Sequence, residues 1–104
     1  MSTILVITNL PSRESALRLA ETLVAARAAA CVNVLAPCQS IYHWQGEIES
    51  AEETPVLVKT TEARYADVER MIRESHPYEL PEIIRVPLTG GLPAYIDWVE
   101  NETR

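Results

Sequence analysis

The sequence of 104 residues has few of the features that mark several large protein classes. It contains no Phe, three Gly and two Cys, and 9 Lys and Arg stand against 15 Asp and Glu, giving a net charge of −6. Two cysteines are too few for a disulfide framework, and the separation of Cys31 and Cys38 matches no zinc or redox motif. An acidic surface repels nucleic-acid phosphates. We therefore expect no nucleic-acid partner.

Long apolar runs are also missing. No run approaches the roughly 20 residues that a membrane helix needs. The first residues, Met1–Ile7, have no basic segment and lead directly into a predicted strand, unlike a secretory signal peptide. Apolar residues still make up 47% of the chain, which is enough for a core. The sequence thus predicts one domain over residues 1–104, no membrane partner and a cytoplasmic location.

The residue sets of common enzymes are not visible either. We find no histidine, carboxylate and nucleophile set of the kind that acyl transfer requires. There is also no glycine-flanked arginine loop that could cradle a phosphate, as an acylphosphatase would need. These observations predict a protein that is not an enzyme and needs no obligatory cofactor.

The most distinctive segment present is a predicted long hairpin over Cys31–Thr61. Gln45-Gly46 lies between two runs of strand-forming residues, which is a strong signal for a two-residue turn. With this turn, the numbers of antiparallel partners add up to about 91. That register pairs Trp44 with Glu47, Tyr42 with Glu49, Leu35 with Val56 and Asn33 with Val58.

Two prolines divide this hairpin into an inner and an outer half. Pro37 lies almost opposite Pro55, and proline cannot donate to a strand ladder, so both strands are expected to kink together. The outer half, Gln39–Trp44 with Glu47–Ala51, forms a two-stranded ribbon of marginal stability. Its apolar side chains are Ile41, Tyr42, Trp44 and Ile48. We predict that this outer half is an oligomerisation arm, and that Glu52-Glu53 beside the kink faces water.

Before the hairpin, the pattern predicts one strand and one helix. Thr3–Asn9 has apolar residues on both faces, which is typical of a central strand. Ser12 is a suitable N-cap for a helix over Ser12–Ala29. We expect that helix to bury a stripe made of Ala16, Leu17, Ala20, Leu23, Val24 and Arg27.

After the hairpin, the pattern predicts a helix, a strand and a final helix. A second helix ends near Ser75, and the proline-bounded residues 76–81 must be extended. Ile83–Leu88 is a strand, in which Pro87 indicates an edge or a strand end, and Pro93 begins the last helix. The order is that of an α+β, ferredoxin-like split βαβ sandwich with an antiparallel sheet, a long kinked hairpin and a C-terminal helix. Its uncovered sheet face is apolar, so we expect other copies of the chain to cover it.

Several strings distributed over the chain resemble one known family. They are Ala29–Val34, Ser40–Tyr42, Trp44–Glu49, Val58–Thr60, His76–Ile83 and Tyr95–Trp98. In this order they resemble the CutA divalent-cation-tolerance family. The resemblance implies a ferredoxin-like subunit in a tight trimer, built like the PII signalling proteins, cytoplasmic in bacteria and linked to copper and other divalent cations.

Two groups of residues are candidate metal ligands. The first is His76 with Tyr78, Glu79 and Glu82, because imidazole and carboxylate suit Cu²⁺ or Zn²⁺. In the alternative interpretation, His76 only caps the end of the preceding helix. The second group is His43 on the outer half of the hairpin, a few pairs from Glu47 and Glu49.

The resemblance also bears on the copper site. It implies ligands at a cysteine near the end of the first strand and at a histidine before the His-Pro pair. This chain has Ile7 and Ser75 at those positions.

We therefore predict a non-enzymatic cytoplasmic homotrimer that binds divalent cations, with Cu²⁺ as the example, and contributes to metal-ion tolerance. One alternative is a PII-like signalling protein that binds a small anionic metabolite between subunits. A cleft lined by Lys59 and Arg85 together would favour it. Another alternative is a trimeric scaffold for a protein partner of unknown identity.

Overall fold

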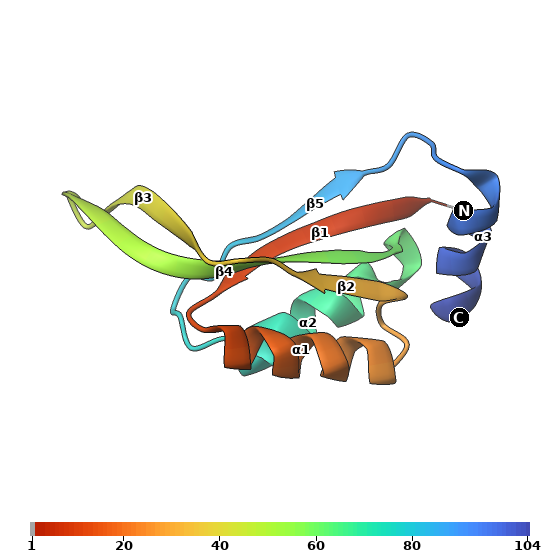
Figure 1. Cartoon of the computed structure of the whole chain (residues 1–104), viewed down its shortest axis with the longest axis horizontal. Helices are drawn as coiled ribbons and strands as arrows, with labels where there is room; N and C mark the ends of the chain where they lie inside the picture. The colour runs from red at the N-terminus through yellow and green to blue at the C-terminus, as the bar shows by residue number, and fades with distance from the viewer. Residues whose placement is uncertain (1) are drawn as a thin grey trace.

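The computed structural model describes residues 2–104. Its central feature is an antiparallel sheet with the strand order β2-β4-β1-β5, as Figure 1 shows. The strands are β1 (Thr3–Leu10), β2 (Cys31–Val34), β3 (Cys38–Trp44), β4 (Glu47–Thr61) and β5 (Ile83–Pro87). β3 pairs with the part of β4 that extends beyond this sheet.

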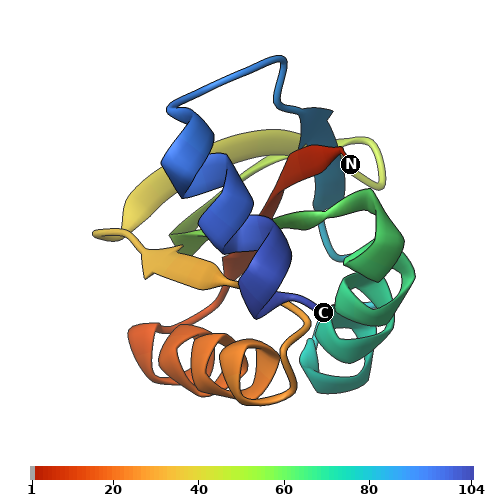
Figure 2. The same cartoon turned by 90° about the vertical axis from the view of Figure 1, so that its right-hand side faces the viewer.

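Three helices cover one face and one end of the sheet. They are α1 (Arg13–Ala25), α2 (Tyr65–Ser75), which follows the short 3₁₀ turn η1 (Glu62–Arg64), and α3 (Pro93–Glu102). α1 and α2 lie side by side on one face, and α3 crosses one end of the sheet (Figure 2). The predicted α+β class, antiparallel sheet and C-terminal helix are therefore confirmed. No helix within residues 2–104 has both the length and the apolar character needed to cross a bilayer.

The core lies between the sheet and the helices α1 and α2. Alternate residues of the two central strands point into it, including Ile4, Val6, Val56 and Val58, each at most 1% exposed. This period of two is what a strand imposes on its side chains. β1 is central, as its two apolar faces predict, and β5 is an edge strand, as Pro87 indicates.

The buried face of α1 differs from the predicted one. Ser12 is the N-cap, and its side chain accepts a hydrogen bond from the backbone N–H of Ser15. The buried residues are Ala16, Leu19 and Leu23, whereas Leu17 and Val24 are 39% and 44% exposed. The predicted stripe was right for Ala16 and Leu23 and wrong for Leu17 and Val24. The helix has apolar residues on two overlapping stripes, and only contact with the sheet selects between them.

The predicted C-terminal end of α1 was also wrong, by four residues. Arg27 has a φ of 58°, in the left-handed region, and so cannot continue the helix. The backbone N–H of Ala28 donates to Leu23 O, and that of Arg27 donates to Val24 O, both at 3.0 Å. These two bonds form a Schellman motif, which ends α1 at Ala25 without a glycine.

The outer half of the hairpin has the predicted register. Gln45 and Gly46 have φ of 51° and 84° and form the turn. Trp44 pairs with Glu47 and Tyr42 with Glu49, and the same register continues to Cys38 and Glu53. The turn residues therefore specify the pairing of the outer half.

The inner half is shifted by one residue from the predicted register. Val34, not Leu35, pairs with Val56, and Asn33 pairs with Leu57. Residues 35–37 separate the paired parts of β2 and β3, whereas only residues 54–55 separate their partners on β4. One extra residue therefore forms a bulge in one strand. Only one of the two strands is interrupted, because β4 continues through Pro55, which pairs with Asn9 of β1.

The outer half projects beyond the helices (Figure 1). We call residues 38–53, which comprise β3, the turn and the facing part of β4, the arm. It lengthens the molecule to 45 Å, against 26 and 24 Å in the other directions. Ile41 and Ile48 are 73% and 72% exposed on it. The sheet face opposite α1 and α2 is also partly open, since Ile84 and Val86 are 49% and 40% exposed.

Candidate functional site

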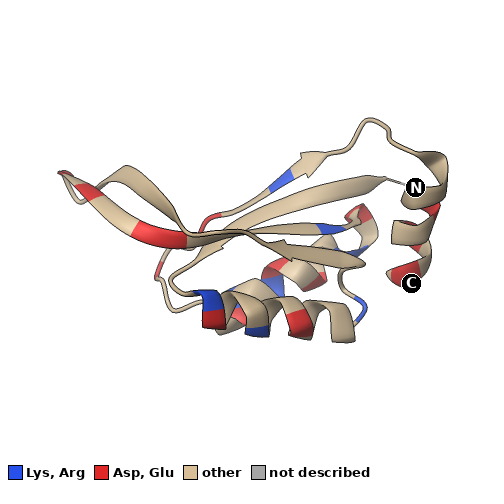
Figure 3. Cartoon of the chain, in the orientation of Figure 1, with Lys and Arg blue, Asp and Glu red and all other residues tan. Residues whose placement is uncertain are grey.

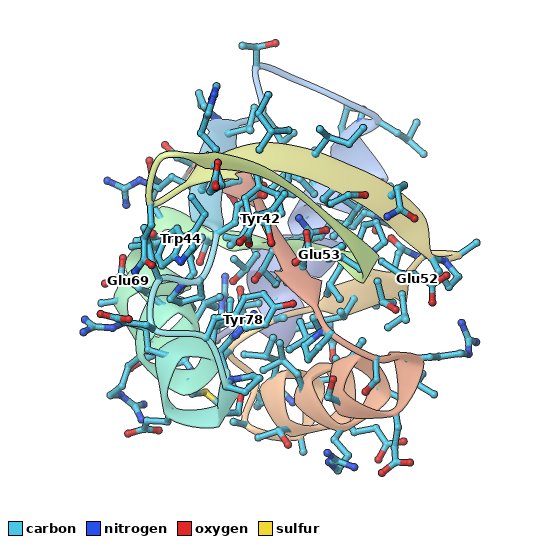
Figure 4. The ribbon with its side chains drawn as sticks, turned by 90° about the vertical axis from the view of Figure 1, so that its left-hand side faces the viewer. Tyr42, Trp44, Glu52, Glu53, Glu69 and Tyr78 are labelled. Atoms are coloured by element: carbon cyan, nitrogen blue, oxygen red, sulfur yellow. The ribbon has the colours of Figure 1, made fainter. Side chains whose placement is uncertain are left out.

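A groove lies between the arm and the loop that joins α2 to β5. We call residues 76–82 the proline loop. The groove has a volume of about 690 Å³ and is lined by residues from the arm and this loop. Its lining includes Tyr42, Trp44, Glu49, Glu53, Tyr78 and Glu79. Figure 4 shows Tyr42, Trp44, Glu53 and Tyr78 around its centre.

Residues from both faces of β3 line the groove, since Ile41 and His43 belong to the lining as well as Tyr42 and Trp44. Tyr42 and Trp44 are two apart in β3, and their partners Glu49 and Glu47 share their face. Glu53 lies on the same face farther down β4 and is half-buried. Glu52 points to the opposite side and is exposed (Figure 4). The prediction that both of these glutamates face water was therefore right for Glu52 and wrong for Glu53.

The proline loop is held in place by His76. This residue is 8% exposed, and its backbone N–H makes the last bond of α2, to Ile72 O at 2.9 Å. Its Nδ1 accepts from the backbone N–H of Tyr78 at 3.2 Å, which leaves Nε2 as the donor to Asn9 O at 2.6 Å. Both ring nitrogens thus join the loop to the end of β1. Asn9 also donates through Nδ2 to Glu82 Oε1 at 2.9 Å.

Tyr78 connects the proline loop to the arm. Burial raises the pKa of the Tyr78 phenol above its usual value of 10.0, and the nearby Glu53 carboxylate raises it further. A neutral phenol can donate to a carboxylate, whereas a phenolate would be repelled by it. Tyr78 and Glu53 therefore meet in the groove, one from the proline loop and one from the arm.

The predicted metal ligands do not converge in one chain. Glu79 is exposed, Glu82 is bonded to Asn9, and both nitrogens of His76 have protein partners. His43 pairs with Ile48, so it lies on the opposite face of the arm from Glu47 and Glu49. Within residues 2–104, no three His, Cys, Asp or Glu side chains gather closely enough to hold a metal ion. The donors of a single chain therefore do not fit a metal site.

The two residues at the positions where the family resemblance implied Cys and His make other contacts. Ile7 pairs with Leu57 in the sheet. Ser75 is the last residue of α2, and its hydroxyl donates to Met71 O at 3.2 Å. Both residues are explained by the packing of the sheet and the end of the helix.

The two basic residues that would favour an anionic ligand lie on opposite faces of the sheet. Lys59 pairs with Leu5, and Arg85 pairs with the next residue, Val6. Arg85 forms an ion pair with Glu62 at 3.1 Å and lies over the ring of Tyr65. Lys59 and Arg85 therefore do not line one cleft in this chain.

Sequence comparison assigns the chain to a family. Residues 4–102 match the family model described as CutA1 divalent ion tolerance protein. The chain belongs to the CutA1 family. A CutA divalent-cation tolerance protein of Thermus thermophilus is 40% identical, over 94% of this chain and 95% of its own length. A chloroplastic CutA protein of Arabidopsis thaliana is 35% identical, and this chain spans only 56% of its length.

Solved CutA1 structures share the fold. The divalent cation tolerance protein of Thermus thermophilus superimposes with a TM-score of 0.96 at 38% identity, over 98% of this chain and 99% of that one. The CutA structure of Xylella fastidiosa gives a TM-score of 0.96 at 36% identity, with both chains fully covered. The resemblance to the CutA family found in the sequence is therefore confirmed.

Sequence reasoning missed the groove of this CutA1 chain. The proline loop and the arm were each considered separately, and no local pattern shows that they meet. The available signal was the hairpin register, which places Tyr42, Glu49 and Glu53 on one face. The contact with Tyr78 depends on how the chain returns from α2 to β5.

Proposed function

We propose that this CutA1 chain is a non-enzymatic cytoplasmic homotrimer that binds divalent cations, such as Cu²⁺, and contributes to metal-ion tolerance. The observation that carries the proposal is the open apolar surface on the arm and on the uncovered sheet face. Ile41, Ile48, Ile84 and Val86 are between 40% and 73% exposed. Apolar surface of this kind marks interaction sites.

Self-association also suits the size and shape of the chain. A domain of about 100 residues buries only about two thirds of its unfolded surface, so assembly adds burial that one copy lacks. The arm is a two-stranded ribbon, which is marginally stable without further packing. Covering it with a neighbouring copy would stabilise both copies.

The proposal places the metal donors on different copies. Because the single chain does not assemble three donors, His43 of one copy and carboxylates of another are the candidates. His43 is exposed, so its imidazole ring can reach a metal ion. Ile48, the residue that pairs with it across the arm, has no metal-binding group, so further donors must come from elsewhere. His76 is a weaker candidate than the sequence suggested, since binding through it would break a bond to Asn9 or Tyr78.

The test combines light scattering with a calorimetric titration of Cu²⁺. We expect a molar mass of about three times the 11.6 kDa of one chain, and copper binding that His43→Ala weakens. His76→Gln serves as the comparison, because it removes the other histidine of the chain. A mass of one chain would contradict the trimer. Copper binding that is the same in the wild type and in His43→Ala would contradict the proposed donor.

A further inference from the structure

The groove has walls of one charge sign. The arm contains Glu47, Glu49, Glu52 and Glu53 and no Lys or Arg, and the proline loop contains Glu79 and Glu82 and no Lys or Arg. Figure 3 shows the arm with acidic positions only, whereas α1 and α2 carry both signs. A cleft lined by one sign of charge raises the local concentration of the opposite ion. The groove therefore favours a cation over an anion.

None of the four lining carboxylates, Glu49, Glu53, Glu79 and Glu82, forms an ion pair with a Lys, Arg or His among residues 2–104. Glu53 lies near the Tyr78 phenol, and Glu82 accepts a hydrogen bond from Asn9. Glu49 and Glu79 have no such neighbour in this part of the chain. Both line the groove, one from each wall. They are thus available to a positively charged ligand.

The groove is also aromatic. Tyr42 and Trp44 come from the arm, and Tyr78 comes from the proline loop. Aromatic faces attract cations, and quaternary ammonium groups in particular are recognised by aromatic side chains arranged around them. Carboxylates and aromatic rings together are the chemistry of an organic-cation site.

The size of the groove separates an organic cation from a metal ion. Its volume of about 690 Å³ is within the range of small-molecule pockets and far larger than a metal ion requires. A metal ion also needs several donors converging on one point, and no such group of His, Cys, Asp or Glu exists within residues 2–104. A bulky cation of low charge density needs only a shaped, acidic and aromatic surface.

We propose that the groove between the arm and the proline loop binds a small organic cation, namely an alkylammonium or quaternary ammonium compound. The ammonium group lies against Tyr42, Trp44 and Tyr78, and Glu49 and Glu79 supply the charge. This site needs no metal ion, although His43, the proposed copper donor, also lines the groove.

The probe is choline, compared with its uncharged isostere 3,3-dimethylbutan-1-ol, which has the same shape. In a Trp98→Phe background, Trp44 is the one tryptophan left, so its fluorescence reports the groove directly. Calorimetry of the same samples gives an independent affinity. We expect binding of choline that weakens with added salt, and much weaker binding of the isostere. Equal responses to both compounds, or no response to choline, would overturn the proposal.

Charge variants locate the site. Glu49→Gln/Glu79→Gln removes two charges from the groove, and we expect it to weaken choline binding roughly tenfold. Glu21→Gln/Glu52→Gln is the matched control, because both residues are exposed and Glu52 lies on the other face of the same arm. Equal weakening by both double variants would show that only the net charge matters and would overturn the proposal. Light scattering of every sample, together with the copper titration, reports the proposed trimeric metal function separately.

Discussion

His76 and Tyr78 are joined in two ways in this CutA1 chain. The backbone N–H of Tyr78 donates to Nδ1 of His76 at 3.2 Å, and the centroids of the two rings are 4.7 Å apart. Since Nδ1 accepts this bond, Nε2 carries the proton that is donated to Asn9 O. His76 therefore fastens the proline loop to the end of β1, and a role in stability follows directly from the geometry.

Replacing His76 by Ala is expected to lower the free energy of unfolding by about 2 to 3 kcal/mol. It would leave the carbonyl of Asn9 without its donor and remove a nearly buried ring. Urea unfolding followed by circular dichroism measures the change. The control is His43→Ala, an exposed position expected to change stability by less than about 0.5 kcal/mol. Equal effects of the two changes would refute the structural role of His76.

High pH is expected to destabilise the chain. The pKa values of Tyr65, Tyr78 and Tyr95 are all raised, with burial as the largest cause. A group with a raised folded-state pKa contributes stability that is complete below its unfolded value, here 10.0, and is lost as the pH rises through the folded value. Unfolding free energies measured at pH 9 to 11 should therefore decrease, and Tyr78→Phe should reduce that decrease.

The cause of the Tyr78 shift can be checked by removing its neighbour. Glu53→Gln deletes the carboxylate that raises the pKa of Tyr78, but leaves its burial unchanged. Titration of phenolate absorbance should show one tyrosine ionising at lower pH than in the wild type. An unchanged titration curve would mean that Tyr78 and Glu53 are not in contact in solution.

The bulge between β2 and β3 predicts a contrast between two changes. Pro37→Ala is expected to cost less than about 1 kcal/mol, because residues 35–37 are outside the paired parts of both strands. Deleting Ala36 removes the extra residue and forces a one-residue shift, which would turn the side chains of β2 or of the arm to the wrong face. We expect that deletion to cost more than about 2 kcal/mol in urea unfolding. Similar costs would show that the bulge does not set the register.

The arm is expected to lose its self-association when its exposed face is charged. Ile41 and Ile48 are on the same face of the arm, away from Tyr42 and Trp44. Ile41→Glu/Ile48→Glu should give a monomer by light scattering, with an unchanged fold by circular dichroism. Leu17→Glu, at an exposed apolar position of α1, is the control and should leave the mass unchanged. An intact trimer in the double variant would move the interface to the uncovered sheet face.

Local signals in the sequence were sufficient for the elements and for part of their pairing. The turn residues Gln45 and Gly46 fixed the register of the arm, and Ser12 fixed the start of α1. Pro87 and Pro93 marked the edge strand and the last helix correctly. Each of these signals acts within a few residues of its own position, so a sequence shows it directly.

Features that depend on distant contacts could not be predicted. Packing against the sheet buries Leu19 of α1 and leaves Leu17 exposed. The pairing of β4 with β1 keeps β4 regular, so the extra residue of the hairpin lies in the other strand. His76 was a candidate metal ligand because imidazole suits Cu²⁺ or Zn²⁺. Its hydrogen-bond partner Asn9 is 67 residues away in the sequence, so no local pattern shows that bond. Residue types alone do not show that both ring nitrogens are already bonded.

The bulge at residues 35–37 also makes the length of the arm independent of the core. The sheet sets the pairing of β2, whereas the turn sets the pairing of β3, and the extra residue absorbs the difference between them. Adding one residue to each strand next to the turn, so that the two new residues pair, would lengthen the arm by about 3.4 Å. Because such an insertion leaves the existing pairs intact, Tyr42 and Glu49 would still face the groove. The reach of a CutA1 arm of this type can therefore change without any repacking of its domain.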